Sequence, residues 1–215
     1  MSNVGIIGGG VSGVISAIYA SKNGNKVTIL EKNNDILKKL LITGSGRCNY
    51  FNSDQNIKHY HSKNEEYLKE IITKENTKEL CKFYDSIGIV PKIKDGYYYP
   101  YSNMAISIKN ALVTEVLKLN IKVICNYDVK SVDYKNNEFT INNDKQFDKL
   151  IISTGSKAYP KTGSDGFGYS LVKKIGHTIN EVKPALVSLC SDDKILNIIS
   201  GVRANAKISL YHFDE

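Results

Sequence analysis

The 215-residue sequence has few residues that form disulfides or metal sites: four cysteines and four histidines. The cysteines (Cys48, Cys81, Cys125 and Cys190) are widely spaced and form no Cys-x-x-Cys pair, which excludes a disulfide framework and a zinc site built on clustered cysteines. No apolar run approaches the roughly 20 residues that a membrane-spanning helix needs. Because the first apolar run begins at residue 3, we expect no signal peptide, no membrane partner and a cytoplasmic location.

Charge of one sign is not concentrated anywhere. The formal net charge is +7, but the lysines lie along the whole chain and are interleaved with acidic residues. This pattern favours a solvated lysine-rich surface over a nucleic-acid footprint, so we expect no nucleic-acid partner. A positive field would also suit an anionic dinucleotide. With 41% hydrophobic and 24% charged residues, the composition is that of an ordinary globular domain.

The most informative stretch lies at the N-terminus. Residues 3–7 form a short apolar run of the kind a buried parallel strand needs, and a helical apolar pattern follows from Val11 to Asn23. A second apolar run, residues 26–30, ends on the carboxylate of Glu31. Between the first run and the helix stand three glycines at Gly-x-Gly-x-x-Gly spacing: Gly8, Gly10 and Gly13.

Each of these residues has a physical reason in a dinucleotide site. Gly8 allows a tight turn off the strand, Gly10 lets a pyrophosphate approach the backbone, and Gly13 lets the helix pack closely on the strand. The helix start offers unpaired N–H groups to phosphates, and Glu31 can accept hydrogen bonds from ribose hydroxyls. A lone glycine motif also fits an ordinary turn, but strand, glycines, helix, strand and acid in this order predict a dinucleotide site.

Two later loops are candidates for ligand contact. Residues 41–49 are rich in glycine and small polar residues around one fixed cation, Arg47, which could reach a phosphate or flavin oxygen or could be an ordinary surface arginine. Residues 147–155 form an apolar strand that ends in the small residues Thr154 and Gly155, where backbone can approach a ligand. Residues 156–168 follow as a long ordered loop.

The remaining patterns predict a three-layer Rossmann-like α/β fold with a parallel sheet and a β-meander. We expect an FAD-binding domain over residues 1–183, with a mainly helical insertion at 52–119, and the start of a β-rich second domain at 184–215. The predicted helices are residues 35–40, two between 64 and 87 (the second capped by Asn76), 104–119 and 167–175. The predicted strands are a hairpin at 89–93 and 97–99, a meander at 122–124, 129–134 and 138–141, and two strands at 185–189 and 206–213.

Four motifs in this order resemble one family, the BaiN/YhiN-type flavoproteins, also called aminoacetone-oxidase-family FAD-binding enzymes. The Thr-Gly-x-Gly-Arg-Cys-Asn element is the specific one, and the resemblance covers nearly the whole chain. The motifs as they stand here are Gly8-Gly9-Gly10-Val-Ser-Gly13 with Glu31-Lys32, then Lys39 with Thr43-Gly-Ser-Gly46-Arg47-Cys48-Asn49, then Asp148 through Thr154-Gly155, and Tyr159-Pro-Lys-Thr-Gly-Ser164.

The resemblance implies an FAD-dependent oxidoreductase that acts on a small organic substrate by hydride transfer through the flavin, with NAD(P)H as a candidate electron donor. It identifies no catalytic residue, and no metal is expected. The cofactor-binding residues that it implies are Gly8, Gly10, Val11, Ser12, Gly13, Glu31, Lys32, Lys39, Gly46, Arg47, Cys48, Asn49, Val129, Thr154 and Gly155.

The chain departs from the family pattern in two respects. The hairpin that usually carries Gly-Arg-apolar-aromatic-Pro reads Gly96-Tyr97-Tyr98-Tyr99-Pro100 here. Family members are also about twice as long, so the missing C-terminal half of the protein is an expected partner of the site. Two alternative functions follow: a flavoprotein that acts on RNA, and a non-catalytic dinucleotide-binding fragment.

Overall fold

The structure is a computed structural model that describes residues 1–62, 64–184 and 191–200, together with residues 202, 207, 209 and 211. Its contacts divide the chain into two units, Met1–Asn180 and Glu181–Glu215. In the second unit the described residues include one short helix, α6 (Ile195–Ile198). The predicted strand at 185–189 lies outside the described residues, as does most of the one predicted at 206–213.

A four-stranded parallel sheet is the centre of the first unit. Its strand order is β10 (Lys149–Ile152), β1 (Asn3–Ile7), β2 (Lys26–Leu30) and β6 (Lys122–Ile124). The register pairs Val4 with both Val27 and Lys149. These strands are short, continuous apolar runs because both faces of the sheet are covered. The predicted Rossmann-like class with a parallel sheet is confirmed.

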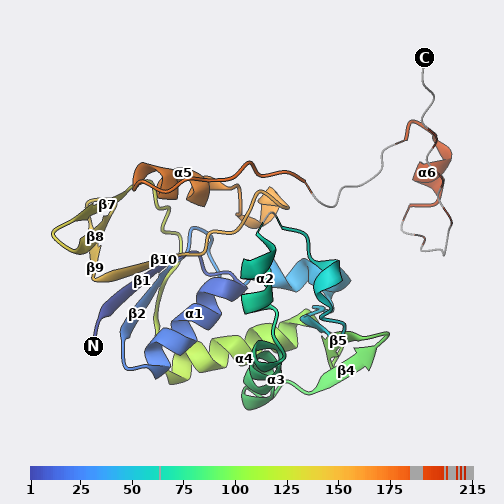
Figure 1. Cartoon of the computed structure of the whole chain (residues 1–215), viewed down its shortest axis with the longest axis horizontal. Helices are drawn as coiled ribbons and strands as arrows, with labels where there is room; N and C mark the ends of the chain where they lie inside the picture. The colour runs from blue at the N-terminus through green and yellow to red at the C-terminus, as the bar shows by residue number, and fades with distance from the viewer. Residues whose placement is uncertain are drawn as a thin grey trace. The chain divides into compact units, whose positions relative to one another are not determined.

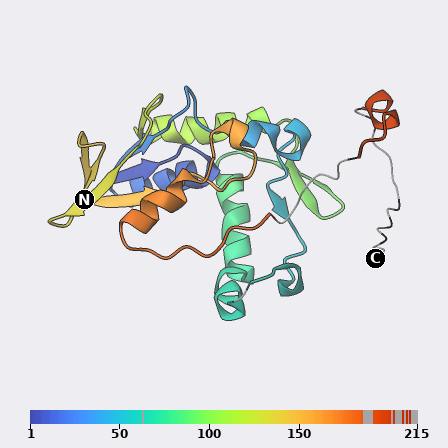
Figure 2. The same cartoon turned by 90° about the horizontal axis from the view of Figure 1, so that it is seen from above.

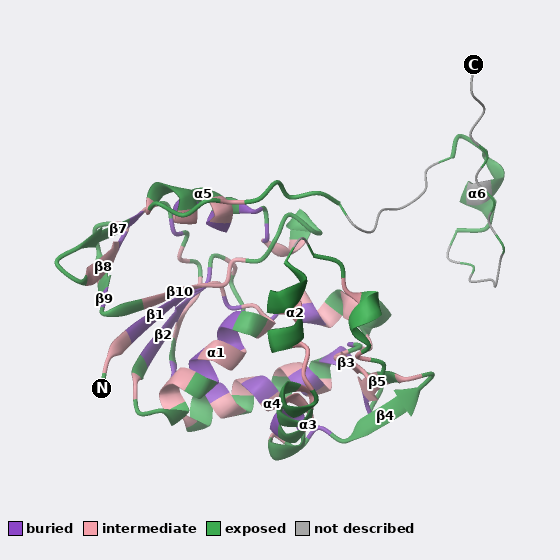
Figure 3. Ribbon diagram, in the orientation of Figure 1, coloured by how far each residue is buried: buried purple, intermediate pink, exposed green. Residues whose placement is uncertain are grey.

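Alternate residues of β1 and β2 enter two different cores, which makes the unit three-layered. Ile6 and Ile29 pack with α1 (Val11–Lys22) and α4 (Ala105–Lys118), whereas Ile7 and Leu30 pack with Leu171 of α5 (Phe167–Lys174) and with the meander. Figure 1 shows α1 and α4 on one side of the sheet and α5 on the other, and Figure 2 shows the same layers from above. Figure 3 shows the buried residues gathered on the strands and on the inward sides of α1 and α4.

The structure contains a three-stranded meander, but the first of its three predicted strands belongs to another sheet. It consists of β7 (Val132–Lys135), β8 (Glu138–Ile141) and β9 (Lys145–Phe147). Residues 122–124, predicted as its first strand, are instead β6 and pair in parallel with β2. A helix followed by a strand is the crossover connection of a parallel sheet, and α4 precedes this strand. β7 starts later than predicted because Asn142 Oδ1 takes up the N–H groups of Lys130 and Ser131, at 2.8 and 3.1 Å.

The predicted helix over residues 35–40 is also wrong. Leu37 has a left-handed φ of 62°, and its N–H donates to the Gly9 carbonyl at 2.8 Å, so this segment is tied to the turn after β1 instead of coiling on itself. A 3₁₀ segment, η1 (Leu40–Gly46), begins only at its end and is interrupted by non-helical residues from Thr43 to Ser45.

The insertion between β2 and β6 is partly helical, with a small antiparallel sheet. It comprises η1, β3 (Phe51–Asn52), η2 (Ile57–His59), α2 (Glu65–Ile71), α3 (Lys74–Ser86), β4 (Pro91–Lys94), β5 (Tyr97–Pro100) and α4. The cap of α3 is Thr73, whose Oγ1 accepts the Asn76 N–H at 3.0 Å, so Asn76 lies inside the helix and is not its cap. The apolar residues Tyr67 and Ile71 of α2 are exposed.

Candidate functional site

The turn between β1 and α1 is built so tightly that two of its glycines cannot be replaced. Gly8 has φ of +102°, and a Cβ there would lie 2.5 Å from the Ser153 carbonyl oxygen of the neighbouring strand end. A Cβ on Gly13 would lie 2.0 Å from the Gly8 carbonyl oxygen and 2.6 Å from Ser153 Oγ. Real Cβ atoms do not make such contacts, so both glycines are required by the packing of strand on helix.

Gly10 is different. It is the N-cap of α1 with φ of −72°, a conformation open to any residue, and a Cβ there would meet nothing within 4 Å. Neither conformation nor packing within the chain therefore calls for glycine at this position. Gly10 lines the cavity described below, so the space beside it is part of that cavity.

The start of α1 presents unpaired donors at this same place. No side chain caps the helix, and its first turn contains no acidic residue. The first backbone bond at this end runs from the Val14 N–H to the Gly10 carbonyl, at 2.9 Å. The N–H groups of the three residues before Val14 consequently have no intrahelical acceptor, and the positive end of the helix dipole adds to their attraction for an anion.

Glu31 lies buried at the end of β2, with 7% of its surface exposed. One carboxylate oxygen accepts the Gly9 N–H at 2.7 Å. The other accepts the backbone N–H and the side-chain amide of Asn33, at 2.8 and 2.7 Å. A carboxylate accommodates about four hydrogen bonds, so these three leave capacity for one more donor.

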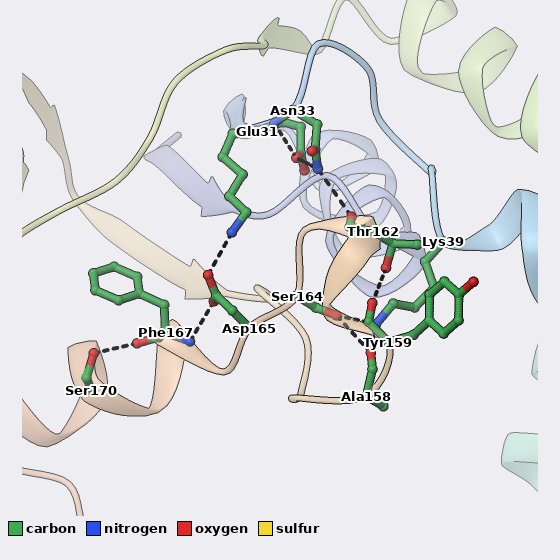
Figure 4. Close-up of polar contacts among 11 residues, drawn as sticks. Glu31, Asn33, Lys39, Ala158, Tyr159, Thr162, Ser164, Asp165, Phe167 and Ser170 are labelled. Atoms are coloured by element: carbon green, nitrogen blue, oxygen red, sulfur yellow. Dashed lines mark hydrogen bonds and ion pairs between the residues drawn. The ribbon is translucent and has the colours of Figure 1, made fainter. Parts of the chain in front are cut away.

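Residues 156–166, which we call the strap, cross from β10 toward this corner of the sheet and are held there by side chains (Figure 4). The Lys39 ammonium donates to the Ala158 carbonyl at 2.5 Å and to the Ser164 hydroxyl. The Asn33 amide, which also holds Glu31, donates to the Thr162 carbonyl at 3.3 Å. Lys39 and Asn33 thus fasten the strap. Lys32, from the same short stretch after β2, is the third residue that does so.

Lys32 forms an ion pair with Asp165 of the strap at 2.9 Å. The hydrogen bond from Lys32 is the main reason why the pKa of Asp165 lies below its usual value, and the Phe167 N–H contributes as well. Partial burial lowers the pKa of Lys39. The strap and the segment that follows β2 are therefore joined by charged and polar side chains.

Between these elements lies a cavity of about 660 Å³. This volume is within the range of small-molecule and cofactor sites. Twelve of the fifteen residues predicted to bind a cofactor line it, whereas Gly13, Gly46 and Arg47 do not. The twelve are Gly8, Gly10, Val11, Ser12, Glu31, Lys32, Lys39, Cys48, Asn49, Val129, Thr154 and Gly155.

Arg47 does not reach the cavity, although the sequence left open a role in binding phosphate or flavin. Its guanidinium lies over the ring of Tyr99, 4.9 Å from the centroid, and its Nε donates to the Gly44 carbonyl at 3.1 Å. Both contacts belong to the turn and hairpin around it. Cys48, the next residue, is buried with φ of 57°, and burial raises the pKa of its thiol.

Several cavity residues were not identified from the sequence. Asn33 and Ser164 join the strap to the site, and Tyr50 and Tyr84 line the cavity along with Cys48. Tyr84 belongs to the apolar stripe of α3, where its spacing indicates only a core residue. Tyr50 directly follows the specific Arg-Cys-Asn element, which was the one available signal. Among the described residues, no group of three or more His, Cys, Asp or Glu side chains could hold a metal ion.

Comparison with known proteins places the chain in a family. Residues 2–206 match the model of the HI0933-like protein Rossmann domain. A 3-dehydro-bile acid delta(4,6)-reductase from Clostridium scindens is 36% identical over 97% of this chain and 52% of its own length. A ribosomal RNA dihydrouridine synthase from Haemophilus influenzae is 26% identical over 92% of this chain and 51% of its own length. The chain thus spans about half the length of the curated relatives that it matches.

A solved structure confirms the fold. The 3-ketosteroid-delta4-(5alpha)-dehydrogenase of Rhodococcus jostii RHA1 superposes with a TM-score of 0.54 and 14% identity, over 74% of this chain and 46% of that one. No helix among the described residues is both long and apolar enough to cross a bilayer.

Proposed function

From the premise that this chain belongs to the HI0933-like protein family, we propose that it binds FAD and forms the cofactor-binding half of a flavin-dependent oxidoreductase. Its substrate is a small organic molecule. We also propose that residues 184–215 begin a second, β-rich domain after the FAD-binding domain of residues 1–183. Membership of the family supports the assignment of the motifs to FAD binding. The structural observation that supports it most directly is the geometry at Gly10.

Gly10 stands beside an open cavity, at the unpaired start of a helix, and nothing in the described part of the chain explains why it has no side chain. A diphosphate seated against this backbone does explain it, because the phosphate oxygens need the space that a Cβ would fill. This distinguishes Gly10 from Gly8 and Gly13, whose packing would require glycine in any protein with this turn.

The remaining cavity residues fit the other parts of an FAD molecule. Glu31 has capacity for a ribose hydroxyl, and Val129, which lines the cavity, would contact the adenosine. Thr154 and Gly155 would offer backbone to the phosphates, and Cys48 and Asn49 would contact the flavin end. When bound, FAD supplies the hydride-transfer chemistry, and the protein supplies its binding, orientation and exclusion from water.

The reaction that we propose is the reduction of a carbon–carbon double bond, with NAD(P)H as the electron donor. The relative with the greater identity is named for reduction of a bile acid, which supports a small organic substrate. The relatives named for RNA are more distant, at 25–26% identity, and the scattered lysines of this chain favour no nucleic-acid footprint.

The substitution Gly10→Ser tests the cofactor site. Serine is among the best N-cap residues, so we expect an unfolding free energy equal to wild type or about 0.5 kcal/mol higher. The serine side chain would occupy the space of the diphosphate, so we expect FAD affinity to fall about tenfold or more, which corresponds to at least about 1.4 kcal/mol. The measurements are urea unfolding and FAD titration followed by the visible spectrum after desalting.

Gly24→Ala is the matched control. Gly24 also has open space around it, but it has φ of +79° and lies at the far end of α1. We expect this variant to lose about 1 kcal/mol of stability and to keep its FAD affinity. Gly10→Ser with wild-type FAD affinity would show that the diphosphate does not lie there, and wild-type protein that retains no FAD would contradict the cofactor itself.

A further inference from the structure

Two tyrosines form an unexplained polar cluster on the wall of the cavity. The rings of Tyr50 and Tyr84 lie 4.4 Å apart between centroids, at an angle of 43°. Both line the cavity, and Tyr84 is 94% buried, with 6% of its surface exposed. Cys48 lines the cavity beside them and is equally buried. No role for either tyrosine follows from the glycine motif or from the strap.

The two hydroxyl groups have no hydrogen-bond partner among the described residues. In the same part of the chain, every fully enclosed side-chain nitrogen or oxygen does have a partner. The Tyr84 hydroxyl therefore keeps some accessible surface. Because Tyr84 is otherwise buried and lines the cavity, we take that surface to face the cavity.

A hydroxyl that has no partner in the described residues and keeps some accessible surface is free to donate a hydrogen bond to a ligand. Burial raises the pKa of both phenols to about 12, with smaller contributions from Cys48 and from neighbouring phenols and, for Tyr50, from Cys81. Both groups are neutral donors at physiological pH, as a tyrosine ordinarily is, and burial keeps them so.

The ligand chemistry follows from that neutrality. Phosphates and carboxylates are recognised by fixed cations in fork or point-charge geometry. Four lysines line the cavity, and two of them, Lys32 and Lys39, are engaged by the strap. No lysine or arginine is among the groups that shift the pKa of Tyr50 or Tyr84. A pair of neutral phenols beside a neutral thiol instead suits a neutral acceptor on an otherwise apolar or planar group, and a carbonyl oxygen is the commonest acceptor of that kind.

We propose that Tyr50 and Tyr84 form a hydrogen-bond donor site for a carbonyl oxygen, with Tyr84 as the principal donor. The carbonyl belongs to the substrate or to the flavin ring of FAD. This inference rests on the proposed function, because it takes the cavity to hold a flavin cofactor and, beside it, a substrate.

The test compares Tyr84→Phe and Tyr50→Phe with Tyr98→Phe in the full chain. Tyr98 is the matched control, since its ring packs edge-on against Tyr50 at 6.2 Å but does not line the cavity. Two dissociation constants are measured for each variant. One is for FAD, by quenching of flavin fluorescence, and the other is for radiolabelled 4-androstene-3,17-dione, by equilibrium dialysis with and without FAD. Circular dichroism melting checks that each variant folds.

We expect Tyr84→Phe to weaken one of the two ligands about three- to tenfold, Tyr50→Phe to weaken the same ligand less, and Tyr98→Phe to change neither. Weaker FAD binding assigns the site to the flavin carbonyls, and weaker steroid binding assigns it to the substrate. If neither dissociation constant changes in Tyr84→Phe, or if Tyr98→Phe has the same effect, the donor site is wrong.

Failure of the proposed function would give a different result from failure of the donor site. Wild-type protein that binds no FAD contradicts the cofactor, and the donor site is then judged on the dialysis without FAD alone. In that arm, steroid binding that weakens in Tyr84→Phe supports the site. Steroid binding that is unchanged, or absent from the wild type, overturns it.

Discussion

The cavity has two walls that are built in different ways. The wall formed by the β1–α1 turn and Glu31 comes from one continuous stretch, residues 3–31, and from close backbone packing. The wall formed by the strap comes from side chains that reach across more than a hundred residues, such as Lys39 to Ser164 and Lys32 to Asp165. The first wall is fixed by sterics and tolerates little change. The second is fixed by polar contacts, and we expect the loss of one of them to affect only the strap.

The largest effect that we expect from this difference is that of Gly13→Ala. The new Cβ would have to lie 2.0 Å from the Gly8 carbonyl oxygen, so α1 must move away from the sheet. We expect a loss of about 3 kcal/mol of unfolding free energy, measured by urea denaturation. Gly10→Ser, three residues away and with no loss expected, is the control. Equal losses in both variants would mean that α1 does not pack against the Gly8 carbonyl as closely as the 2.0 Å approach requires.

Gly163→Ala should have an intermediate effect, confined to the strap. Gly163 has φ of +102°, and a Cβ there would lie 2.5 Å from the Asn33 amide nitrogen, so the alanine adds both backbone strain and a clash. We expect a loss of about 1–2 kcal/mol and faster proteolytic cleavage within residues 156–166, detected by limited proteolysis and mass spectrometry. Cleavage that begins instead in the parallel sheet would contradict the separation of the two walls.

Asp165→Asn should have the smallest effect. The ion pair with Lys32 is exposed, so we expect a loss of only about 0.5 kcal/mol at pH 7. The pKa of Asp165 is lower in the folded protein than the ordinary 3.8, so its stabilisation is present above that value and disappears as the pH falls through the folded pKa. The difference in unfolding free energy between wild type and variant should therefore vanish in strong acid.

A double-mutant cycle isolates this contact. In the Asp165→Asn background, Lys32→Ala should cost nothing further, and 1 M NaCl should remove most of the effect of either single substitution. A loss that persists in high salt or in strong acid would show that Asp165 acts through its hydrogen bond to the Phe167 N–H and not through Lys32.

The contrast between the walls also explains what the sequence could predict. The β1–α1–β2 unit was predicted with the strand bounds that the structure has, because its strands, glycines and helix face are encoded by local spacing. The helix predicted at 35–40 is wrong because the Leu37 N–H donates to the Gly9 carbonyl. The spacing of apolar residues within the segment carries no information on this contact. Residues 122–124 were recognised as a strand, but which sheet they join depends on a partner almost a hundred residues away.

The site was predictable to the same extent. Gly8, Gly10 and Glu31, which the sequence predicts to bind a cofactor from their type and position, line the cavity, whereas Gly13 does not. Arg47 was a candidate because of its charge, yet Tyr99 and the Gly44 carbonyl hold it elsewhere. The strap was expected only as an ordered loop, and its attachment to Asn33 and Lys39 depends on folded distances. Tyr84 could not be predicted as a cavity residue, because the apolar face of a helix has the same spacing whether it packs against a core or lines a cavity.

The strap has a consequence for the kinetics of ligand exchange. Residues 162–165 of the strap line the cavity, and the bonds to Asn33, Lys39 and Lys32 hold them there, so we expect a ligand that contacts the strap to leave faster when these bonds break. One of these bonds is an exposed ion pair that salt weakens, so the dissociation rate should rise with ionic strength even where the affinity of the turn for phosphate changes little. Residence time and affinity would then be set by different walls of the same cavity.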